Sequence, residues 1–297
     1  MADKIKLATI EAGGTWGRLG IWLTAGLKPA GFEVELMKRG SEIPETAYRV
    51  DSGEADLSVS TTFGAREAYL GKPPYDKRLQ IKGIAEIQYP NHWFVNMIKV
   101  ETGLSSFEDL VKKHPPLRLC LPSPAILVSY PVKAIFKLFG IDPYTDIPKW
   151  GGEIITNFND APELIATGRA DGLFRENSPR RYDISQLAEM TFFQLSEHQV
   201  RKLSDELGIK AGLITAGTYK NQREDIRTLD AEGFTVFTRN DLSEEFGYRI
   251  ARAIDHHTQT HYISSSTYYS PRFAVHTGAP LHEGAARYYR ECGYLPQ

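Results

Sequence analysis

The sequence lacks the features that mark disulfide scaffolds, zinc proteins, nucleic-acid-binding proteins and membrane proteins. It has two cysteines in 297 residues, Cys120 and Cys292, which lie far apart in the chain and argue against a disulfide framework. No CxxC or HExxH pattern is present. The net charge is −2 and no basic block stands out, so nothing favours nucleic-acid binding. No apolar run approaches the roughly 20 residues that a membrane-spanning helix needs.

Cofactor and export motifs are also missing. The glycine-rich stretch "GGTWGRLG" has neither the GxG of a dinucleotide loop nor the Lys-Ser/Thr of a Walker loop, so we expect no nucleotide and no other cofactor. His257 and His261 have the spacing of helical metal ligands. The motif carries no carboxylate, however, and we expect a solvated helix end rather than a metal site.

The N-terminal sequence "MADKIKLATIE" has no apolar stretch of the kind found in signal peptides. We therefore expect a periplasmic protein if an export signal has been trimmed, and a cytoplasmic protein if Met1 is the native start.

What the sequence does contain is a long alternation of strand-like and helix-like segments. This alternation predicts an α/β fold with mostly parallel sheets. The expected strands are 5–11, 33–38, 55–60, 80–88, 93–99, 117–122, 153–157, 171–175, 191–195 and 234–238. The expected helices are 16–29, 42–52, 62–70, 106–113, 130–139, 160–168, 197–207, 241–258 and 282–291.

The length of the chain predicts two lobes, each with its own core. Two stretches have the pattern of crossings between lobes, "AEIQYPNHWFVNMIKV" and "KAGLITAGTYKNQREDIRTL". We therefore expect a first lobe of residues 1–90 plus 210–297 and a second lobe of residues 91–209. A chain that leaves one lobe and later returns creates a cleft, and clefts between lobes are common binding sites for small molecules.

Polar loops follow several of the expected strands. The first is the glycine-rich stretch, whose backbone N–H groups at a helix start favour an anion such as a carboxylate. Gly40-Ser41, the hydroxyl run 60–62 and Ser123 stand at similar turns. A single serine of this kind is usually only a helix cap. Four such loops at strand ends together favour a binding site.

The sequence resembles the TAXI-family solute receptors of TRAP transporters, which have the two-lobed type II periplasmic-binding-protein fold. The resemblance spans nearly the whole chain. It is carried by "GGTWGRLG", "RGSEIPETAYRVDSGEADLSVSTTFGAREAYLG", "QYPNHWFV", "TGRADGLF" and "PLHEGAARYYRECGYLP". The sequence departs from the family pattern at Pro122-Ser123-Pro124, where receptors usually have Gly-Ser-Gly, and it has no export signal.

The resemblance implies a small organic anion, a carboxylate, held between the lobes and presented to a membrane transporter, with no metal or cofactor. The residues it implicates are Gly14, Thr15, Trp16, Ser41, Ser60, Thr61, Thr62, Tyr89, His92, Ser123, Arg175 and Glu176. Arg175 has two interpretations: direct pairing with the carboxylate, or an exposed arginine paired with Glu176. Likewise, His92 fits either the cleft or the core of the hinge, and His282 fits a helix cap better than a ligand contact.

A second functional class stays open beside the receptor. It is a cytoplasmic enzyme on the same fold that acts on a small carboxylic acid, for example a decarboxylase or a hydrolase. Its candidate groups are His92, Glu11, Glu86 and Glu176, and no nucleophile–base motif accompanies them. We expect a binding protein without catalytic residues.

Overall fold

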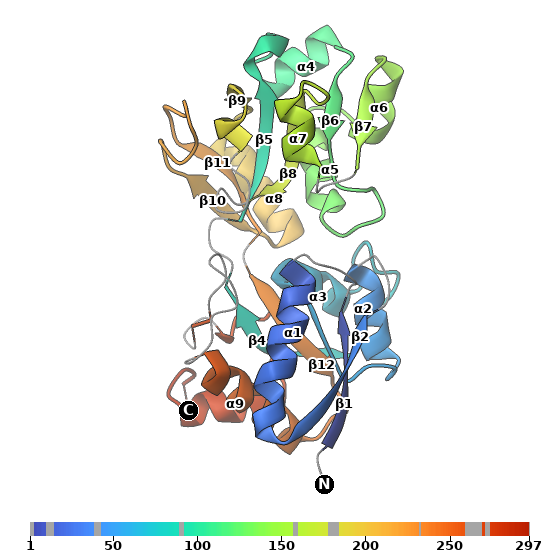
Figure 1. The fold of residues 1–297 in the computed structure, drawn as a ribbon, viewed down its shortest axis with the longest axis vertical. Coiled ribbons are helices and arrows are strands. Elements are labelled where there is room, and N and C mark those ends of the chain that lie inside the picture. The colour runs from blue at the N-terminus through green and yellow to red at the C-terminus, as the bar shows by residue number, and fades with distance from the viewer. Residues whose placement is uncertain are drawn as a thin grey trace. The chain divides into compact units, whose positions relative to one another are not determined.

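The computed structural model describes residues 3–9, 15–38, 43–88, 92–156, 160–177, 184–231, 233–258, 269–270 and 274–296. The chain forms two compact units. Unit 1 comprises Met1–Pro90 and Glu232–Gln297, and unit 2 comprises Asn91–Ala231. Each unit has its own sheet and its own layers of helices (Figure 1).

Unit 1 is built on a five-stranded sheet in the order β2-β1-β3-β12-β4. Strand β1 is parallel to β2 and β3, whereas β12 is antiparallel to both of its neighbours, β3 and β4. Strands β1, β3 and β4 therefore run in the same direction and end at the same edge of the sheet. The strands are β1 (Asp3–Thr9), β2 (Phe32–Lys38), β3 (Leu57–Thr61), β4 (Ile81–Ile87) and β12 (Phe234–Arg239).

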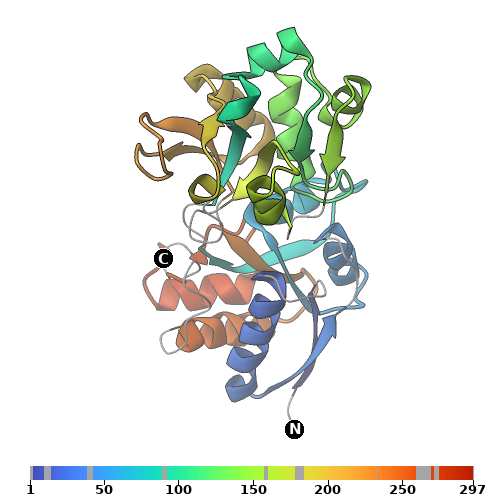
Figure 2. The ribbon, with the colours of Figure 1, turned by 45° about the horizontal axis from the view of Figure 1, so that its top comes forward.

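The main hydrophobic core of unit 1 lies between the sheet and three helices that pack together, α1, α9 and α11 (Figure 2). Leu19, Leu23 and Ile254 are among the fully buried side chains of this core. Helices α2 and α3 contact each other and strand β3. The helices are α1 (Thr15–Leu27), α2 (Ile43–Asp51), α3 (Thr62–Leu70), α9 (Glu244–Thr258) and α11 (Glu283–Glu291), with a 3-10 turn over Lys28–Ala30.

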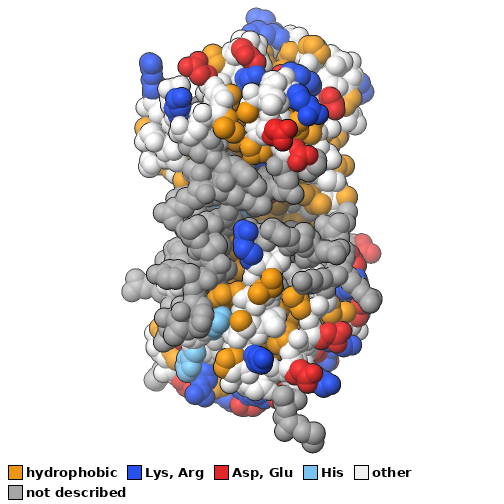
Figure 3. All heavy atoms as spheres, in the orientation of Figure 1, with side chains coloured by type: hydrophobic (Ala, Val, Ile, Leu, Met, Phe, Trp, Pro, Cys, Tyr) orange, Lys and Arg blue, Asp and Glu red, His pale blue; other side chains and the backbone are white. Residues whose placement is uncertain are grey.

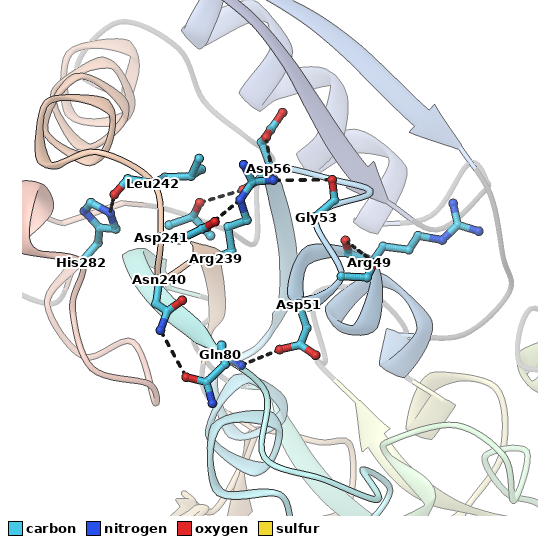
Figure 4. A network of polar contacts seen from close by, with 12 residues as sticks. Arg49, Asp51, Gly53, Asp56, Gln80, Arg239, Asn240, Asp241, Leu242 and His282 are labelled. Carbon is cyan, nitrogen blue, oxygen red and sulfur yellow. Dashed lines mark hydrogen bonds and ion pairs between the residues drawn. The ribbon is translucent and has the colours of Figure 1, made fainter.

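A polar network joins segments at the opposite edge of the unit 1 sheet, where β3 and β4 begin and β12 ends (Figure 4). Arg239 Nε donates to Asp241 Oδ1 at 2.7 Å, and its Nη1 lies 3.5 Å from Asp56 Oδ1. The backbone N–H of Gln80 donates to Asp51 Oδ1 at 2.7 Å. The network fixes three strand ends relative to one another at this edge.

Unit 2 contains a second mixed sheet with the strand order β10-β11-β5-β8-β6-β7, and β9 pairs with β5. Strands β6, β7 and β8 are parallel, while β5 is antiparallel to β8, β9 and β11. The strands are β5 (Trp93–Lys99), β6 (Arg118–Cys120), β7 (Glu153–Ile155), β8 (Gly172–Asn177), β9 (Met190–Phe192), β10 (Lys210–Ile214) and β11 (Ile226–Asp230).

A cluster of aromatic rings forms part of the unit 2 core. The Phe107 ring stacks on Phe139 with 4.4 Å between centroids, and it meets Phe136, Phe174 and Phe193 edge-on. The helices of this unit are α4 (Phe107–Lys113), α5 (Ser129–Lys137), α6 (Pro143–Lys149), α7 (Ala161–Ala166) and α8 (Glu197–Leu207), with 3-10 turns over Val100–Thr102 and Ile184–Gln186. Cys120 is a free, buried thiol, as expected.

Two expectations from the sequence are wrong. The sheets are mixed rather than mostly parallel, because β12 and β5 run against their neighbours. The stretch 210–231 is not a crossing back to unit 1: β10 and β11 pair with each other, and β11 pairs with β5 of unit 2. The loop between them is held by the Gln222 side chain, whose Nε2 donates to Ile214 O and Thr215 O at 3.1 Å.

Helices α9 and α11 approach closely because glycine stands where they meet. A Cβ at Gly284 would lie 1.8 Å from the carbonyl oxygen of Glu244. His282 caps α11, since its Nδ1 accepts a hydrogen bond from the Gly284 N–H at 3.2 Å, and its Nε2 lies 3.0 Å from Leu242 O. The expectation that His282 caps the last helix is confirmed.

We predict that Gly284→Ala lowers the free energy of unfolding by about 1–3 kcal/mol, because the added methyl group has to push the two helices apart. The matched control is Arg290→Ala on the exposed side of the same helix, expected to stay within about 0.5 kcal/mol of wild type. Denaturant titration followed by circular dichroism measures both. Equal stability of Gly284→Ala and wild type would contradict the close approach.

Candidate functional site

The carboxyl edge of the unit 1 sheet collects the ends of β1, β3 and β4 and the start of β12. Trp16, in the first turn of α1, packs edge-on against Phe234 with 4.7 Å between ring centroids. The Thr9 hydroxyl donates to the carbonyl oxygen of Trp16 at 3.3 Å. Trp16 therefore lies at this edge, partly buried against the core.

A row of polar side chains crosses the sheet of unit 1, one residue in from its carboxyl edge. The register pairs Ser60 of β3 with Thr235 of β12, and Thr235 with Glu86 of β4. Directly paired residues point to the same face, so the row faces away from the core formed by their neighbours along the strands. All three residues are at most 1% exposed. Gly233 makes room for the acid, because a Cβ there would lie 2.9 Å from Glu86 Oε1.

The other two hydroxyls of the 60–62 run have partners within unit 1. Thr61 is the N-cap of α3, with its Oγ1 accepting from the Gly64 N–H at 3.1 Å. The Thr62 hydroxyl lies 3.2 Å from that of Thr235. Both threonines are buried, and their local bonds account for the positions of their side chains.

Tyr75 and Glu67 adjoin this row. Burial raises the pKa of the Tyr75 phenol, and the neighbouring Ser60 hydroxyl partly offsets the increase. Burial also raises the pKa of Glu67. The Arg66 guanidinium opposes this increase, and its Nη1 donates to Glu67 Oε1 at 2.6 Å. The face of unit 1 behind α3 is thus a buried polar layer, where each group needs a hydrogen-bonding partner to offset its desolvation.

Unit 2 has a comparable carboxyl edge, formed by the ends of β6, β7 and β8. Arg175 and Glu176 are consecutive residues of β8, paired in register with Val95 and Phe94 of β5. Arg175 Nη2 donates to Glu176 Oε1 at 2.8 Å. The two side chains are only 5% and 12% exposed. Arg175 is therefore paired with Glu176, which was one of the two interpretations from the sequence. That interpretation expected an exposed arginine, whereas the side chain is buried.

Tyr144 of α6 adjoins this ion pair. Burial raises the pKa of the Tyr144 phenol, and the nearby Arg175 guanidinium opposes this shift. Its hydroxyl donates to Pro122 O at 2.6 Å, which fixes α6 to the loop that follows β6. Arg175 also acts on Cys120 of β6, where burial raises the thiol pKa to about 11. The thiol is therefore protonated at neutral pH.

Ser123 and His92 occupy two other positions in unit 2. Ser123 lies in the loop after β6, half-buried, with its carbonyl oxygen accepting from the Ile126 N–H at 3.1 Å. His92 is buried just before β5, and its carbonyl oxygen accepts from the Ala231 N–H at 2.7 Å. This bond joins the two ends of unit 2 where the chain enters and leaves it.

Several residues expected at the site lie outside the described residues: Gly14, Ser41 and Tyr89, and Glu11 among the candidate acids. Thr15 begins α1, and its side chain is likewise not described. The described residues form two groups. Trp16, Ser60, Thr61 and Thr62 lie at the edge of unit 1, and His92, Ser123, Arg175 and Glu176 at the edge of unit 2.

The sequence analysis did not identify two residues of these edges: Tyr144 in unit 2, and Thr235, which pairs with Ser60 in unit 1. The segment "DPYTDIPK" does carry a helix start signal, since Asp142 is the N-cap of α6 and Pro143 its first residue. Thr235 stands one strand away from Ser60, and pairing between strands that are distant in the sequence is not visible in the sequence.

Charge and metal-binding groups give no other site in the part of the chain that the structure describes. On the face drawn in Figure 3, basic and acidic side chains are interspersed over both units. The described residues contain no group of three or more His, Cys, Asp or Glu side chains placed to hold a metal ion. None of their helices has the length and apolar character needed to cross a membrane.

The sequence pattern of the NMT1-like family matches residues 13–293. The chain belongs to the NMT1-like family. No curated protein matches it in sequence.

Solved structures share the fold of this NMT1-like chain at low sequence identity. PhnD1 from Prochlorococcus marinus, in complex with methylphosphonate, is 11% identical over 99% of both chains, with a TM-score of 0.55. MatC from Rhodopseudomonas palustris, with bound malate, is 10% identical over 97% of this chain and 96% of its own, with a TM-score of 0.56. The binding protein component of an ABC phosphonate transporter from Pseudomonas aeruginosa is 14% identical over 91% and 82%, with a TM-score of 0.53. The fold is that of type II periplasmic binding proteins, as the resemblance to TAXI-family receptors implied.

We predict that the Arg175–Glu176 pair is strongly coupled. Arg175→Met leaves a buried carboxylate without its cation and should lower the free energy of unfolding by about 3–5 kcal/mol. The double variant Arg175→Met/Glu176→Gln should recover most of this loss, because no buried charge remains. Thermal and denaturant unfolding of the four proteins in the cycle measure the coupling.

The control for this cycle is an exposed pair of similar geometry. Arg201 and Glu197 are 2.6 Å apart and about 70% exposed, so Arg201→Met should change stability little. Additive losses in the Arg175–Glu176 cycle would show that the buried pair is not coupled.

Proposed function

We propose that this protein is a solute-binding protein that captures a small organic anion, a carboxylate, and delivers it to a membrane transporter. The observation that carries the proposal is the fold shared over nearly the full length of both chains with MatC, which was crystallised with bound malate. PhnD1, with methylphosphonate, adds a second neighbour with a bound organic anion.

The proposed ligand contacts come from both units. In unit 1 they are Gly14, Thr15, Trp16, Ser41, the run Ser60–Thr62 and Tyr89. In unit 2 they are His92, Ser123, Arg175 and Glu176. The described members of this set lie at the carboxyl edges of the two sheets, where ligands bind in open α/β sheets. At such an edge, a guanidinium held by Glu176 offers oriented N–H donors to a carboxylate.

We further propose a periplasmic location and a transporter of the TRAP type. The support for the transporter class is the set of motifs shared with TAXI-family receptors, above all the C-terminal "PLHEGAARYYRECGYLP" and the unit "GEADL". The described part of that C-terminal motif packs α11 against α9 and the sheet of unit 1.

We predict that the protein is stabilised by small carboxylates and not by nucleotides. A ligand at 100 times its Kd should add about 2.7 kcal/mol to the free energy of unfolding, which raises Tm by several degrees. Differential scanning fluorimetry with malate, succinate, glutamate and benzoate, beside NAD and ATP, makes the comparison. Mass spectrometry of the recovered ligand should find it unchanged.

A rise in Tm with NAD or ATP and with none of the carboxylates would contradict the proposal. Steady chemical conversion of a bound carboxylate would also contradict the proposal, because a receptor releases its ligand unchanged.

A further inference from the structure

Lys133 is a cation in unit 2 whose charge is not balanced by any ion pair among the described residues. It lies on α5, about one turn from the first residue of that helix, and is half-buried. Its Nζ is 5.0 Å from the centroid of the Tyr144 ring and 5.5 Å from that of Tyr130. The two aromatic faces hold the ammonium group by cation–π attraction, which orients the charge without neutralising it.

Tyr144 connects this ammonium group to the ion pair of β8. Arg175 and Glu176 both act on the Tyr144 hydroxyl, the first lowering and the second raising its pKa. The ring of the same tyrosine contacts Lys133. Lys133, Tyr144, Arg175 and Glu176 are therefore neighbours in one polar cluster at the carboxyl edge of unit 2.

Lys133 is the one charged side chain of this cluster for which no ion pair is found among the described residues. Arg175 and Glu176 neutralise each other across a 2.8 Å bond. Asp142 also acts on Tyr144, but its side chain is exposed and caps α6 by accepting from the Tyr144 N–H at 3.0 Å. The Cys120 thiol has a raised pKa and carries no charge at neutral pH. Among the described residues, the Lys133 ammonium group therefore has aromatic contacts but no carboxylate within ion-pair distance.

We propose that Lys133 is the residue that balances the charge of the bound carboxylate, while Arg175, held by Glu176, contributes directed hydrogen bonds. This inference rests on the proposed function and deepens it by assigning the charge recognition of the ligand to one lysine. A compact ammonium group acts on an anion as a point charge. A carboxylate at this edge supplies the ion-pair partner that Lys133 lacks among the described residues, and a second carboxylate on the same ligand needs donors from elsewhere in the protein.

The test compares Lys133→Met with Lys137→Met. Lys137 lies one turn further along the same helix, exposed, and makes no aromatic contact among the described residues. Calorimetric titration with malate, succinate, glutamate and benzoate at low salt gives Kd for each protein. We expect Lys133→Met to raise Kd for every carboxylate that wild type binds by about tenfold or more, and Lys137→Met to leave it within about twofold.

Two further measurements separate charge recognition from a structural role. Lys133→Arg keeps the charge and should recover most of the affinity. The Tm of unliganded Lys133→Met should stay near that of wild type, because its aromatic neighbours retain an apolar side chain to pack against. Affinity should also fall with added salt in wild type more steeply than in Lys133→Met.

Each contrary outcome has a distinct meaning. Wild-type Kd values in Lys133→Met overturn this inference and leave the proposed function standing. A lowered Tm with unchanged Kd assigns Lys133 to the packing of α5 against α6 and also overturns it. Failure of wild type to bind any of the four carboxylates overturns the proposed function, and the inference with it.

Discussion

The ion pair between Arg175 and Glu176 is the interaction on which the polar edge of unit 2 depends. Successive residues of a strand normally point to opposite faces, and in β8 the long Arg175 side chain nevertheless reaches the carboxylate of its neighbour Glu176. Both residues lie near the end of β8, where they pair with Val95 and Phe94 of β5, and both side chains are buried. Removing either charge from such a site costs more than the pair itself contributes, and this keeps the two residues together.

Unit 1 meets the same constraint with hydroxyl groups and a single acid. Its buried row places Ser60, Thr235 and Glu86 on three adjacent strands, and the Thr62 hydroxyl joins from the start of α3. Glycine at position 233 leaves space for the carboxylate of Glu86. The two edges thus differ in character: hydroxyls and one acid in unit 1, and an ion pair with a nearby lysine in unit 2.

Much of this fold could be predicted from the sequence, because most strands carry apolar runs that end in recognisable turns. Strand β5, for example, is buried along its whole length and has the bounds expected from its apolar run. Strand β10 is mostly exposed and shows no such run, so the hairpin that it forms with β11 was mistaken for a crossing between lobes. Helix α6 is short and contains Pro148, which weakens its helical pattern.

The site was predictable only where it is local in the sequence. Arg175 follows the apolar Leu173 and Phe174 at a strand end, and its partner in one of its two interpretations, Glu176, is the next residue. Tyr144 and Lys133 join that pair through tertiary packing of α5 and α6, which no spacing in the sequence reveals. The central proposal, that the protein binds a carboxylate at the two polar edges described above, is tested most directly by hydrogen–deuterium exchange with and without the carboxylate that raises Tm most. The account predicts slower exchange in peptides covering residues 61–64 of unit 1 and 123–130 of unit 2 together, and protection confined to one unit would contradict it.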